Sequence, residues 1–433
     1  EDPLYSGVGK LLGVVIEKSN VNTIRVEVMD DKAQISEGSL VSVMIGDRET
    51  LYQIVDGIAE SEDLERSNRH GYVQVVARKI GRWVEGTSQL EQVPWTPQIY
   101  APVYSVDSVE STPNRQCIGY IPRTNYGIKV DCNQLVTHNT AILGVLGMGK
   151  TFLALELVER MAEAGIKVWV IDTTNEYEKN LTRYISSEKQ AAADKEIQEG
   201  IEDLKTKYNA NKELGGNHPK FRELIQSHIG TYLLDETWTV RVFNPDSYYV
   251  TEQTGWRDKQ GEVGFGEYSR AQKTRVIAEV LLDLLSKEQT SSAKLCLVLE
   301  EAHSLAPEWN VVVDDGDKAA SNATAKAILQ GRKYGFGCLV ITQRTAHVTK
   351  SILNQCHTIF ALRTFDRTGM EFLSNYLGDD YTNMLNSLEA QQCVAYGRAI
   401  NSGTPLIVSL NRREDFISSA LDVEVPDEEQ QEG

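Results

Sequence analysis

The chain has 433 residues, 41% of them hydrophobic and 24% charged, so it can hold two or three domains with a sizeable core. It has no run of eighteen apolar residues, so we expect no transmembrane helix and no membrane partner. The net charge of −18 argues against a uniformly nucleic-acid-binding surface, but residues 414–433 alone hold eight acids, and a local groove can differ from the average. The six cysteines are scattered without a C-x-x-C pair, which predicts a reducing, cytoplasmic location with neither disulfides nor zinc.

The first part of the chain has the pattern of a small β-barrel. Short runs that alternate apolar and polar residues are separated by Asn, Asp and Gly turns, and they cover residues 11–16, 23–29, 40–45, 51–55 and 72–77. Several short strands at this spacing predict a β-barrel domain over residues 1–90. Pro94, Pro97, Pro102 and Pro113 then predict an extended connector over residues 91–135, with room for one more strand.

The remainder alternates apolar runs with helical patterns. The strand-like runs are residues 140–143, 167–172, 239–243, 295–299, 337–342, 358–362, 392–396 and 406–410. This alternation predicts an α/β core with a mostly parallel sheet over residues 136–179 and 236–415. Residues 180–235 are charged and helical, so we expect a helical insertion there with residues 266–288 packing on it. Residues 416–433 form an acidic tail.

One stretch identifies the ligand class. Gly144-Val-Leu-Gly-Met-Gly-Lys150-Thr151 reads G-x-x-x-x-G-K-T between a predicted strand and a predicted helix, which is the context that a phosphate-binding P-loop requires. Its backbone N–H groups and the helix N-terminus would hold phosphate oxygens, Lys150 would reach the β- and γ-phosphates, and Thr151 would bind Mg²⁺. We therefore predict ATP and Mg²⁺ as cofactors. The predicted nucleotide-binding residues are Gly144, Leu146, Gly147, Met148, Gly149, Lys150, Thr151 and Phe152.

A second motif supplies acids for hydrolysis. The apolar run of residues 295–299 ends in Glu300 and Glu301, the pattern called Walker B. A strand would carry both carboxylates to the carboxyl edge of the sheet and alternate the sides to which they point. We predict that Glu300 binds Mg²⁺ through its water shell and that Glu301 polarises the attacking water as general base. The alternative is that both are surface acids that end a core strand.

Three more side chains are candidates for contact with the reacting phosphate. Gln343 ends the run of residues 337–342, where it would orient water, or would merely cap the strand. Arg332, in Gly-Arg-Lys-Tyr-Gly, is a candidate arginine finger supplied by a neighbouring subunit, or a solvated helix end. Arg363, after the following run, is a further candidate of the same kind. Asp172 and Glu176 follow the second core strand, where both would act on water or Mg²⁺; Glu176 would alternatively contact a subunit or be structural.

Taken together, these motifs resemble the HerA family of RecA-like DNA-pumping ATPases. The resemblance is carried by the P-loop, Asp172 with Asn-Glu-Tyr177, Leu-Glu-Glu-Ala-His303, Gly-Arg-Lys-Tyr-Gly335, Ile-Thr-Gln343 and residues 352–356 with Arg363. It implies a RecA-like core behind a family-type barrel. It also implies a homohexameric ring that threads duplex DNA and hydrolyses ATP between subunits. Its implied partners are a NurA-type nuclease, or in anti-phage defence a sirtuin-like or other effector.

Three functional hypotheses follow. The first is an ATP-dependent DNA translocase or helicase coupled to a nuclease or effector, in DNA-end processing or anti-phage defence. The second is an ATP-binding hexameric scaffold that assembles and gates an effector enzyme, which the acidic balance favours. The third is a conjugative or secretion ATPase, and the N-terminal barrel and the lack of a transmembrane run count against it.

Overall fold

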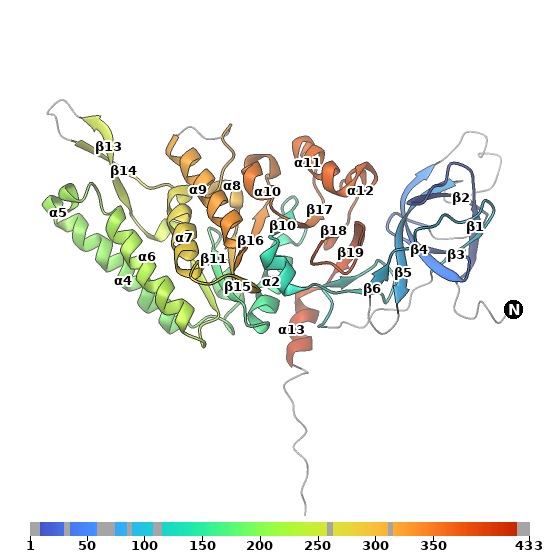
Figure 1. Ribbon diagram of the computed structural model, residues 1–433, viewed down its shortest axis with the longest axis horizontal. Helices are drawn as coiled ribbons and strands as arrows, with labels where there is room; N and C mark the ends of the chain where they lie inside the picture. The colour runs from blue at the N-terminus through green and yellow to red at the C-terminus, as the bar shows by residue number, and fades with distance from the viewer. Residues whose placement is uncertain are drawn as a thin grey trace, which may run out of the picture. The chain divides into compact units, whose positions relative to one another are not determined.

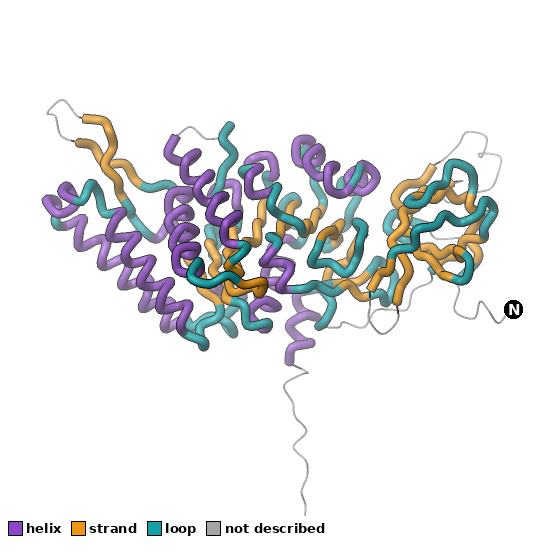
Figure 2. Tube along the Cα trace, viewed as in Figure 1, coloured by secondary structure: helices purple, strands orange, loops and turns teal. Residues whose placement is uncertain are grey.

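The computed structural model describes residues 9–29, 35–58, 74–84, 89–106, 115–257, 263–310 and 315–421. The chain divides into two units. The first comprises Glu1–Asp131, Val145–Phe152 and Ile359–Gly433, and the second comprises Cys132–Gly144 and Leu153–Thr358. Figure 1 labels the helices and strands along the chain, and Figure 2 separates them by type. Among the helices of these described residues, none is both long and apolar enough to cross a bilayer.

A closed antiparallel barrel opens the first unit. Its strands follow the order β2-β1-β7-β3-β4-β5, and pairing of β2 with β5 closes the circle. They are β1 (Leu11–Val15), β2 (Thr23–Val28), β3 (Leu40–Ile45), β4 (Arg48–Ile58), β5 (Gln74–Val84) and β7 (Pro102–Ser105), with β6 (Gln89–Glu91) added to β5. Alternate residues such as Ile24, Val26, Val41 and Val43 fill the interior. Closure leaves no unpaired edge on these six strands, and the predicted barrel is confirmed.

The C-terminal segment of the first unit adds strands that pair antiparallel with a short hairpin. β18 (Gln392–Gly397) pairs with β19 (Leu406–Leu410), β19 with β8 (Gly119–Tyr120), and β8 with β9 (Gly127–Ile128). β17 (Thr358–Leu362) precedes them, with helices α11 (Arg367–Leu377), α12 (Asp379–Met384) and α13 (Arg413–Leu421). The fully buried Gln53 amide joins this segment to the barrel, because it donates to Ile407 O at 3.2 Å and accepts from Ile407 N at 2.7 Å.

A five-stranded parallel sheet forms the core of the second unit. Its order is β12-β11-β15-β16-β10, with parallel pairing at each step. The strands are β10 (Thr140–Leu143), β11 (Lys167–Ile171), β12 (Val240–Phe243), β15 (Thr290–Leu299) and β16 (Tyr334–Thr342). Their central residues are buried, as expected for parallel strands covered on both faces. The predicted RecA-like P-loop α/β class, with its parallel core sheet, is confirmed.

Helices cover this sheet. They are α1 (Cys132–Thr137), α2 (Lys150–Glu163), whose first three residues belong to the first unit, α3 (Tyr177–Asn180), α7 (Arg270–Leu285), α8 (Ala302–Leu305), α9 (Asp315–Gly331) and α10 (Lys350–Leu353). The 3₁₀ turns η3 (Pro245–Ser247) and η4 (Thr345–His347) and the hairpin of β13 (Thr251–Arg257) with β14 (Val263–Glu267) complete this unit. α7 packs on α9 and on β16, and α1 packs on β15 and β16.

The segment between β11 and β12 is helical. α4 (Ser187–Thr206) and α6 (His218–Leu234) lie side by side, with α5 (Tyr208–Glu213) between them in the chain (Figure 2). Arg241 of β12 is almost fully buried, forms an ion pair with Asp194 of α4 and lies over the ring of Trp169. Because removal of Asp194 would leave the buried Arg241 cation without this partner, the pair helps to hold α4 against the sheet.

Lys79 of β5 generates a prediction about stability and pH. Its Nζ donates to Val93 O at 2.8 Å and to Trp95 O at 2.6 Å, and burial lowers its pKa to about 8. In the unfolded chain its pKa is near ~10.4, so the unfolded state binds more protons between these two values. The contribution of Lys79 to the free energy of unfolding therefore rises as pH increases from about 8 to about 10.5.

In urea unfolding experiments, we expect the free energy of unfolding of the wild type to rise relative to that of Lys79→Met across that pH interval. The matched control is Lys195→Met, because Lys195 lies exposed on α4. Its difference from the wild type should not change over the same interval. If the difference in free energy of unfolding between the wild type and Lys79→Met also stayed constant with pH, the lowered pKa of Lys79 would be contradicted.

Candidate nucleotide-binding site

The P-loop has the backbone conformation that its glycines permit. β10 ends at Leu143, and Gly144 N donates to Thr342 O, the carbonyl of the last residue of β16, at 3.4 Å. Gly144, Gly147 and Gly149 have φ values of 154°, 82° and 102°. Side chains with a Cβ rarely adopt these values, and at Gly147 an added Cβ would meet nothing within 4 Å. Backbone conformation, rather than lack of space, therefore requires glycine at Gly147.

Two backbone hydrogen bonds within the first unit fix the loop. Val145 N donates to Arg363 O at 2.8 Å, and Gln391 N donates to Met148 O at 3.0 Å. Gln391 has a positive φ of 62°, and Arg363 Nε donates to Leu388 O at 2.5 Å. The structure therefore places Arg363, predicted as a finger, in a scaffold that supports the P-loop of its own chain.

The remaining predicted nucleotide-binding residues lie in the P-loop and in the first turn of helix α2. Lys150 begins α2, is 6% exposed, and its Nζ donates to Val145 O at 2.9 Å, so the ammonium lies over the loop. Thr151 is the next residue of the helix, in the position from which a P-loop hydroxyl binds Mg²⁺. Leu146 and Phe152 are exposed, at 79% and 46%. The loop and the first turn of α2 thus bring these predicted residues together.

Glu300 is held by a tyrosine in the second unit. It follows β15, its N–H donates to Ile171 O at 3.1 Å, and its side chain is almost fully buried. The Tyr177 hydroxyl donates to Glu300 Oε2 at 2.6 Å. Burial, and next the charge of Glu300, raise the pKa of Tyr177 well above its ordinary value, so this hydroxyl keeps its proton. Tyr177 therefore acts as the donor that stabilises an ionised Glu300.

Asp172 fixes the turn that carries this tyrosine. Its carboxylate accepts from Thr174 N and Thr174 Oγ1, both at 2.7 Å, and from Asn175 N and Tyr177 N, both at 3.0 Å. Asn175 has a positive φ of 60°, which such an Asp-centred turn accommodates. The prediction for Asp172 was a role on water or Mg²⁺, whereas these bonds give its carboxylate a structural role in the turn. Glu176 caps α3 by position, without a capping bond from its side chain.

At Glu301 the alternation of side-chain directions along β15 ends. It has left-handed backbone angles, with φ 52° and ψ 51°, which is an uncommon and strained state for glutamate. His303 Nδ1 lies 3.2 Å from Glu301 Oε2 and 3.4 Å from Thr342 Oγ1. Gln343 follows directly after Thr342. The strained backbone therefore aims Glu301 away from the face that Glu300 occupies, toward the end of β16.

Arg332 lies at the other end of β16. It precedes Tyr334, the first residue of that strand, whereas Gln343 follows the last. Nine residues at about 3.3 Å each separate them by roughly 30 Å. Arg332 therefore lies at the amino edge of the parallel sheet, and Glu300, Glu301 and Gln343 lie at its carboxyl edge.

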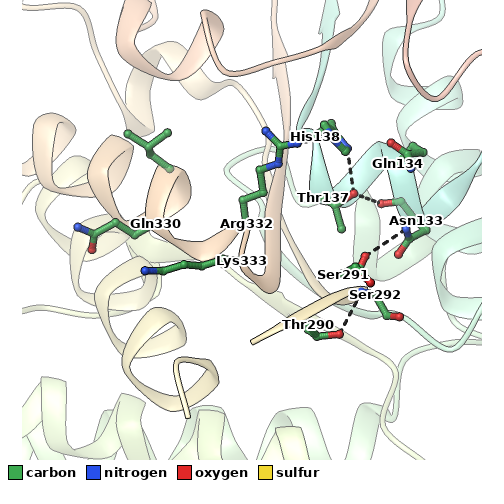
Figure 3. Close-up of a pocket in the computed structure, with 11 residues that line it drawn as sticks. Asn133, Gln134, Thr137, His138, Thr290, Ser291, Ser292, Gln330, Arg332 and Lys333 are labelled. Carbon is green, nitrogen blue, oxygen red and sulfur yellow. Dashed lines mark hydrogen bonds between the residues drawn. The ribbon is translucent and has the colours of Figure 1, made fainter. Parts of the chain in front are cut away.

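A pocket of about 890 Å³ surrounds Arg332 (Figure 3). It is lined by Asn133, Gln134, Thr137, His138, Thr290, Ser291, Ser292, Leu329, Gln330, Arg332 and Lys333. The lining combines two basic side chains with amides and hydroxyls, and it contains no carboxylate. Its chemistry suits an anionic group.

Sequence reasoning missed two of these functional contacts. Tyr177 stood in the Asp172 motif without a role, and His138 was not assigned to any site. A tyrosine five residues after a strand-ending aspartate is a weak signal, because only the tertiary fold brings it to Glu300. The Thr151 hydroxyl in the first unit and the Glu300 carboxylate in the second are each of the oxygen-ligand type that Mg²⁺ prefers. Among the described residues, no cluster of three or more acidic, His or Cys side chains could hold a metal ion.

Comparisons with known proteins agree with these motifs. Residues 116–236 match the family model described as Helicase HerA, central domain. A probable helicase of Methanocaldococcus jannaschii is 20% identical over 419 residues, covering 83% of this chain and 79% of that protein. The DNA double-strand break repair helicase HerA of Pyrococcus furiosus is 26% identical over 125 residues, covering 28% of this chain and 22% of that protein. VirB4 of Thermoanaerobacter pseudethanolicus aligns with a TM-score of 0.40 and 13% identity, over 70% of this chain and 98% of that chain.

Tyr177→Phe tests how Glu300 is held. Without the hydroxyl, the buried carboxylate loses a donor and its orientation, so Mg²⁺ should bind more weakly. We expect the Mg²⁺ concentration for half-maximal ATP hydrolysis to rise about 10-fold to 100-fold. Tyr184→Phe is the matched control, because the Tyr184 hydroxyl also donates to a carboxylate, Glu163 Oε1, at 2.5 Å but at an exposed position. An unchanged Mg²⁺ dependence in Tyr177→Phe would refute the role.

Proposed function

We propose that the chain is a HerA-type ATP-hydrolysing P-loop enzyme and, on that premise, an ATP-driven DNA translocase or helicase, which its similarity to HerA helicases supports. We propose further that it acts as a homohexamer on duplex DNA together with a nuclease or other effector, in DNA-end processing or anti-phage defence. The observation that carries this proposal is the carboxyl edge of the sheet. There Glu300 is held by Tyr177, Glu301 lies beside His303 on a left-handed backbone, and β10 runs directly into the P-loop.

Each proposed role follows from the chemistry of its group. The P-loop N–H groups and Lys150 would bind the phosphates of ATP. Thr151 and Glu300 would each offer an oxygen ligand to Mg²⁺, which would supply charge neutralisation for the transferring phosphoryl group. Glu301 takes a proton from the attacking water, and Gln343 orients that water. His303 Nδ1 lies 3.2 Å from Glu301 Oε2, at the carboxylate of this proposed base.

Arg332 is proposed to act in trans. At the amino edge of its own sheet it is far from the acids at the carboxyl edge, but a neighbouring subunit in a ring could present it to their phosphate. The cationic, carboxylate-free lining around it supports this role. Arg363 is proposed to support the P-loop rather than to act as a finger, because its carbonyl and its Nε both bond within the chain.

Two variants separate binding from hydrolysis. Lys150→Ala removes the ammonium group that is proposed to contact the phosphates, and we expect loss of ATP binding as measured with a fluorescent nucleotide. Glu301→Gln keeps size and polarity but not the base, so it should bind ATP normally and hydrolyse it about 10²-fold to 10⁴-fold more slowly. If Glu301→Gln releases phosphate at the wild-type rate, Glu301 is not the base.

A second candidate function is an ATP-binding hexameric scaffold that assembles and gates an effector. The net charge of −18 favours it, because an acidic surface repels DNA phosphates outside a local groove. The two candidates differ in whether DNA changes the hydrolytic rate.

The discriminating measurement is the ATPase rate with and without linear duplex DNA, on protein of measured oligomeric mass. For the translocase we expect several-fold stimulation on a hexamer, decreasing as salt rises because phosphate contacts release counterions. Glu301→Gln serves as the background control. Hydrolysis by a hexamer that is indifferent to DNA would support the scaffold and contradict the translocase.

A further inference from the structure

Arg332 forms a hydrogen bond with a histidine that belongs to a short relay. Its Nη2 bonds to His138 Nε2, and His138 Nδ1 lies 3.0 Å from Thr137 Oγ1 (Figure 3). Thr137 Oγ1 in turn donates to Asn133 O at 2.7 Å. The relay therefore runs from a carbonyl of α1 to the guanidinium.

The relay defines the protonation state of His138. A guanidinium has only donors, so His138 Nε2 must accept from Arg332 and carries no proton. The Thr137 hydroxyl uses its proton on Asn133 O, so its oxygen accepts from His138 Nδ1–H. His138 is thus a neutral imidazole with one defined tautomer, and an imidazolium could not accept from Arg332.

Hydrogen bonds of Asn133 anchor the start of the relay to the neighbouring strand. Asn133 Nδ2 donates to Ser291 O at 3.4 Å, and Ala293 N donates to Asn133 Oδ1 at 2.6 Å, so both bonds join α1 to the start of β15. The His138 side chain is 8% exposed, whereas Arg332 is exposed in the pocket. A buried ring thus holds the head of an exposed, otherwise flexible side chain.

We propose that His138 is the positioning residue for Arg332, and that its neutral imidazole presents the guanidinium to an anionic phosphate brought by a second copy of this chain. This inference rests on the proposed trans role of Arg332 and specifies how that arginine is held. The pocket provides the anion with a second cation, Lys333, and no carboxylate. Holding the arginine before the phosphate arrives reduces the entropy lost on contact.

The proposal makes hydrolysis sensitive to protonation of His138. The charged and titratable groups that the structure places around it are Arg332, Lys333 and His357, whose ring lies edge-on with centroids 5.7 Å apart. A proton on His138 would remove the acceptor and add a cation beside Arg332, so the guanidinium would be released.

The test compares His138→Gln with His138→Leu in the full chain. Glutamine offers a carbonyl acceptor that does not titrate, whereas leucine offers none. We expect His138→Leu to lower kcat about 10-fold to 100-fold with unchanged ATP affinity, because a misplaced catalytic group costs rate rather than binding. His138→Gln should restore most of kcat and remove the part of the acid fall in rate that His138 causes, while His303 remains in both proteins.

Double variants distinguish positioning from a structural effect. With Arg332→Ala already present, His138→Leu should cause no further loss, because the group that it positions is gone. Mixing His138→Leu subunits with Glu301→Gln subunits should restore part of the activity, since each defect lies at a different edge. Fully multiplicative losses, or wild-type kcat in His138→Leu, would overturn the proposal.

The outcomes also separate this inference from the proposed function. If Arg332→Ala hydrolyses ATP normally, the trans finger itself is wrong. If Arg332→Ala is inactive and His138→Leu is fully active, only the positioning role fails. Should His138→Leu not fold, Thr137→Val tests the same relay, because it removes the acceptor that fixes the tautomer. It should then lower kcat without changing ATP affinity, and unchanged kcat would refute the relay.

Discussion

Parallel pairing of β10, β16 and β15 is the constraint on which the rest of the second unit depends. Parallel strands end at the same edge, so Leu143, Thr342 and Leu299 gather there although they are far apart in the chain. Each strand then continues into a functional segment: the P-loop, Gln343 and the Glu300–Glu301 pair. The order in which β16 separates the other two also places Thr342 Oγ1 near His303. The sheet therefore determines which polar groups can act together.

This edge buries charge, and the surrounding network offsets the cost. An ionised carboxylate as buried as Glu300 is unfavourable unless it is hydrogen-bonded, and Tyr177 supplies a short bond from a hydroxyl that keeps its proton. Asp172 in turn accepts four bonds from the turn that carries Tyr177. The strained Glu301 backbone belongs to the same arrangement, since a non-glycine residue in the left-handed region persists only where its surroundings enforce it. The hydrogen bond from Tyr177 thus orients Glu300, and the strained backbone of Glu301 orients the neighbouring acid.

The sequence allowed prediction of features that depend on local pattern. The P-loop, the strand ending in Glu300 and Glu301, and the barrel runs follow from spacing and alternation over a few residues, and the structure has strands at each. Features set by distant partners could not be predicted. β7 comes from the Pro-rich connector and completes the barrel only through pairing with β1 and β3. The antiparallel pairing of β19 with β8 likewise depends on residues nearly three hundred positions apart.

The same reason explains what was missing from the predicted site. Motif spacing identified Arg332 but could not show that it would bond to the ring of His138 in the turn after α1, because residues 138 and 332 meet only after β16 pairs with β10. His138 by itself carries no signal, since an isolated histidine before a strand is usually structural. The protonation state was also invisible in the sequence. It follows from counting donors and acceptors along Arg332, His138, Thr137 and Asn133.

The two edges of one sheet lead to a conclusion about assembly. The acids and Gln343 lie at the carboxyl edge, and Arg332 with its relay lies at the amino edge, roughly 30 Å of strand away. No side chain spans that distance, so within one chain Arg332 cannot neutralise a phosphate on which Glu301 acts. Either Arg332 has no part in hydrolysis, or a second copy supplies it. A head-to-tail contact that joins the amino edge of one chain to the carboxyl edge of the next closes into a ring when its rotation permits. A buried histidine that holds an exposed arginine in place is expected only if a second copy supplies that arginine, because a solvated arginine without a role in hydrolysis needs no such support.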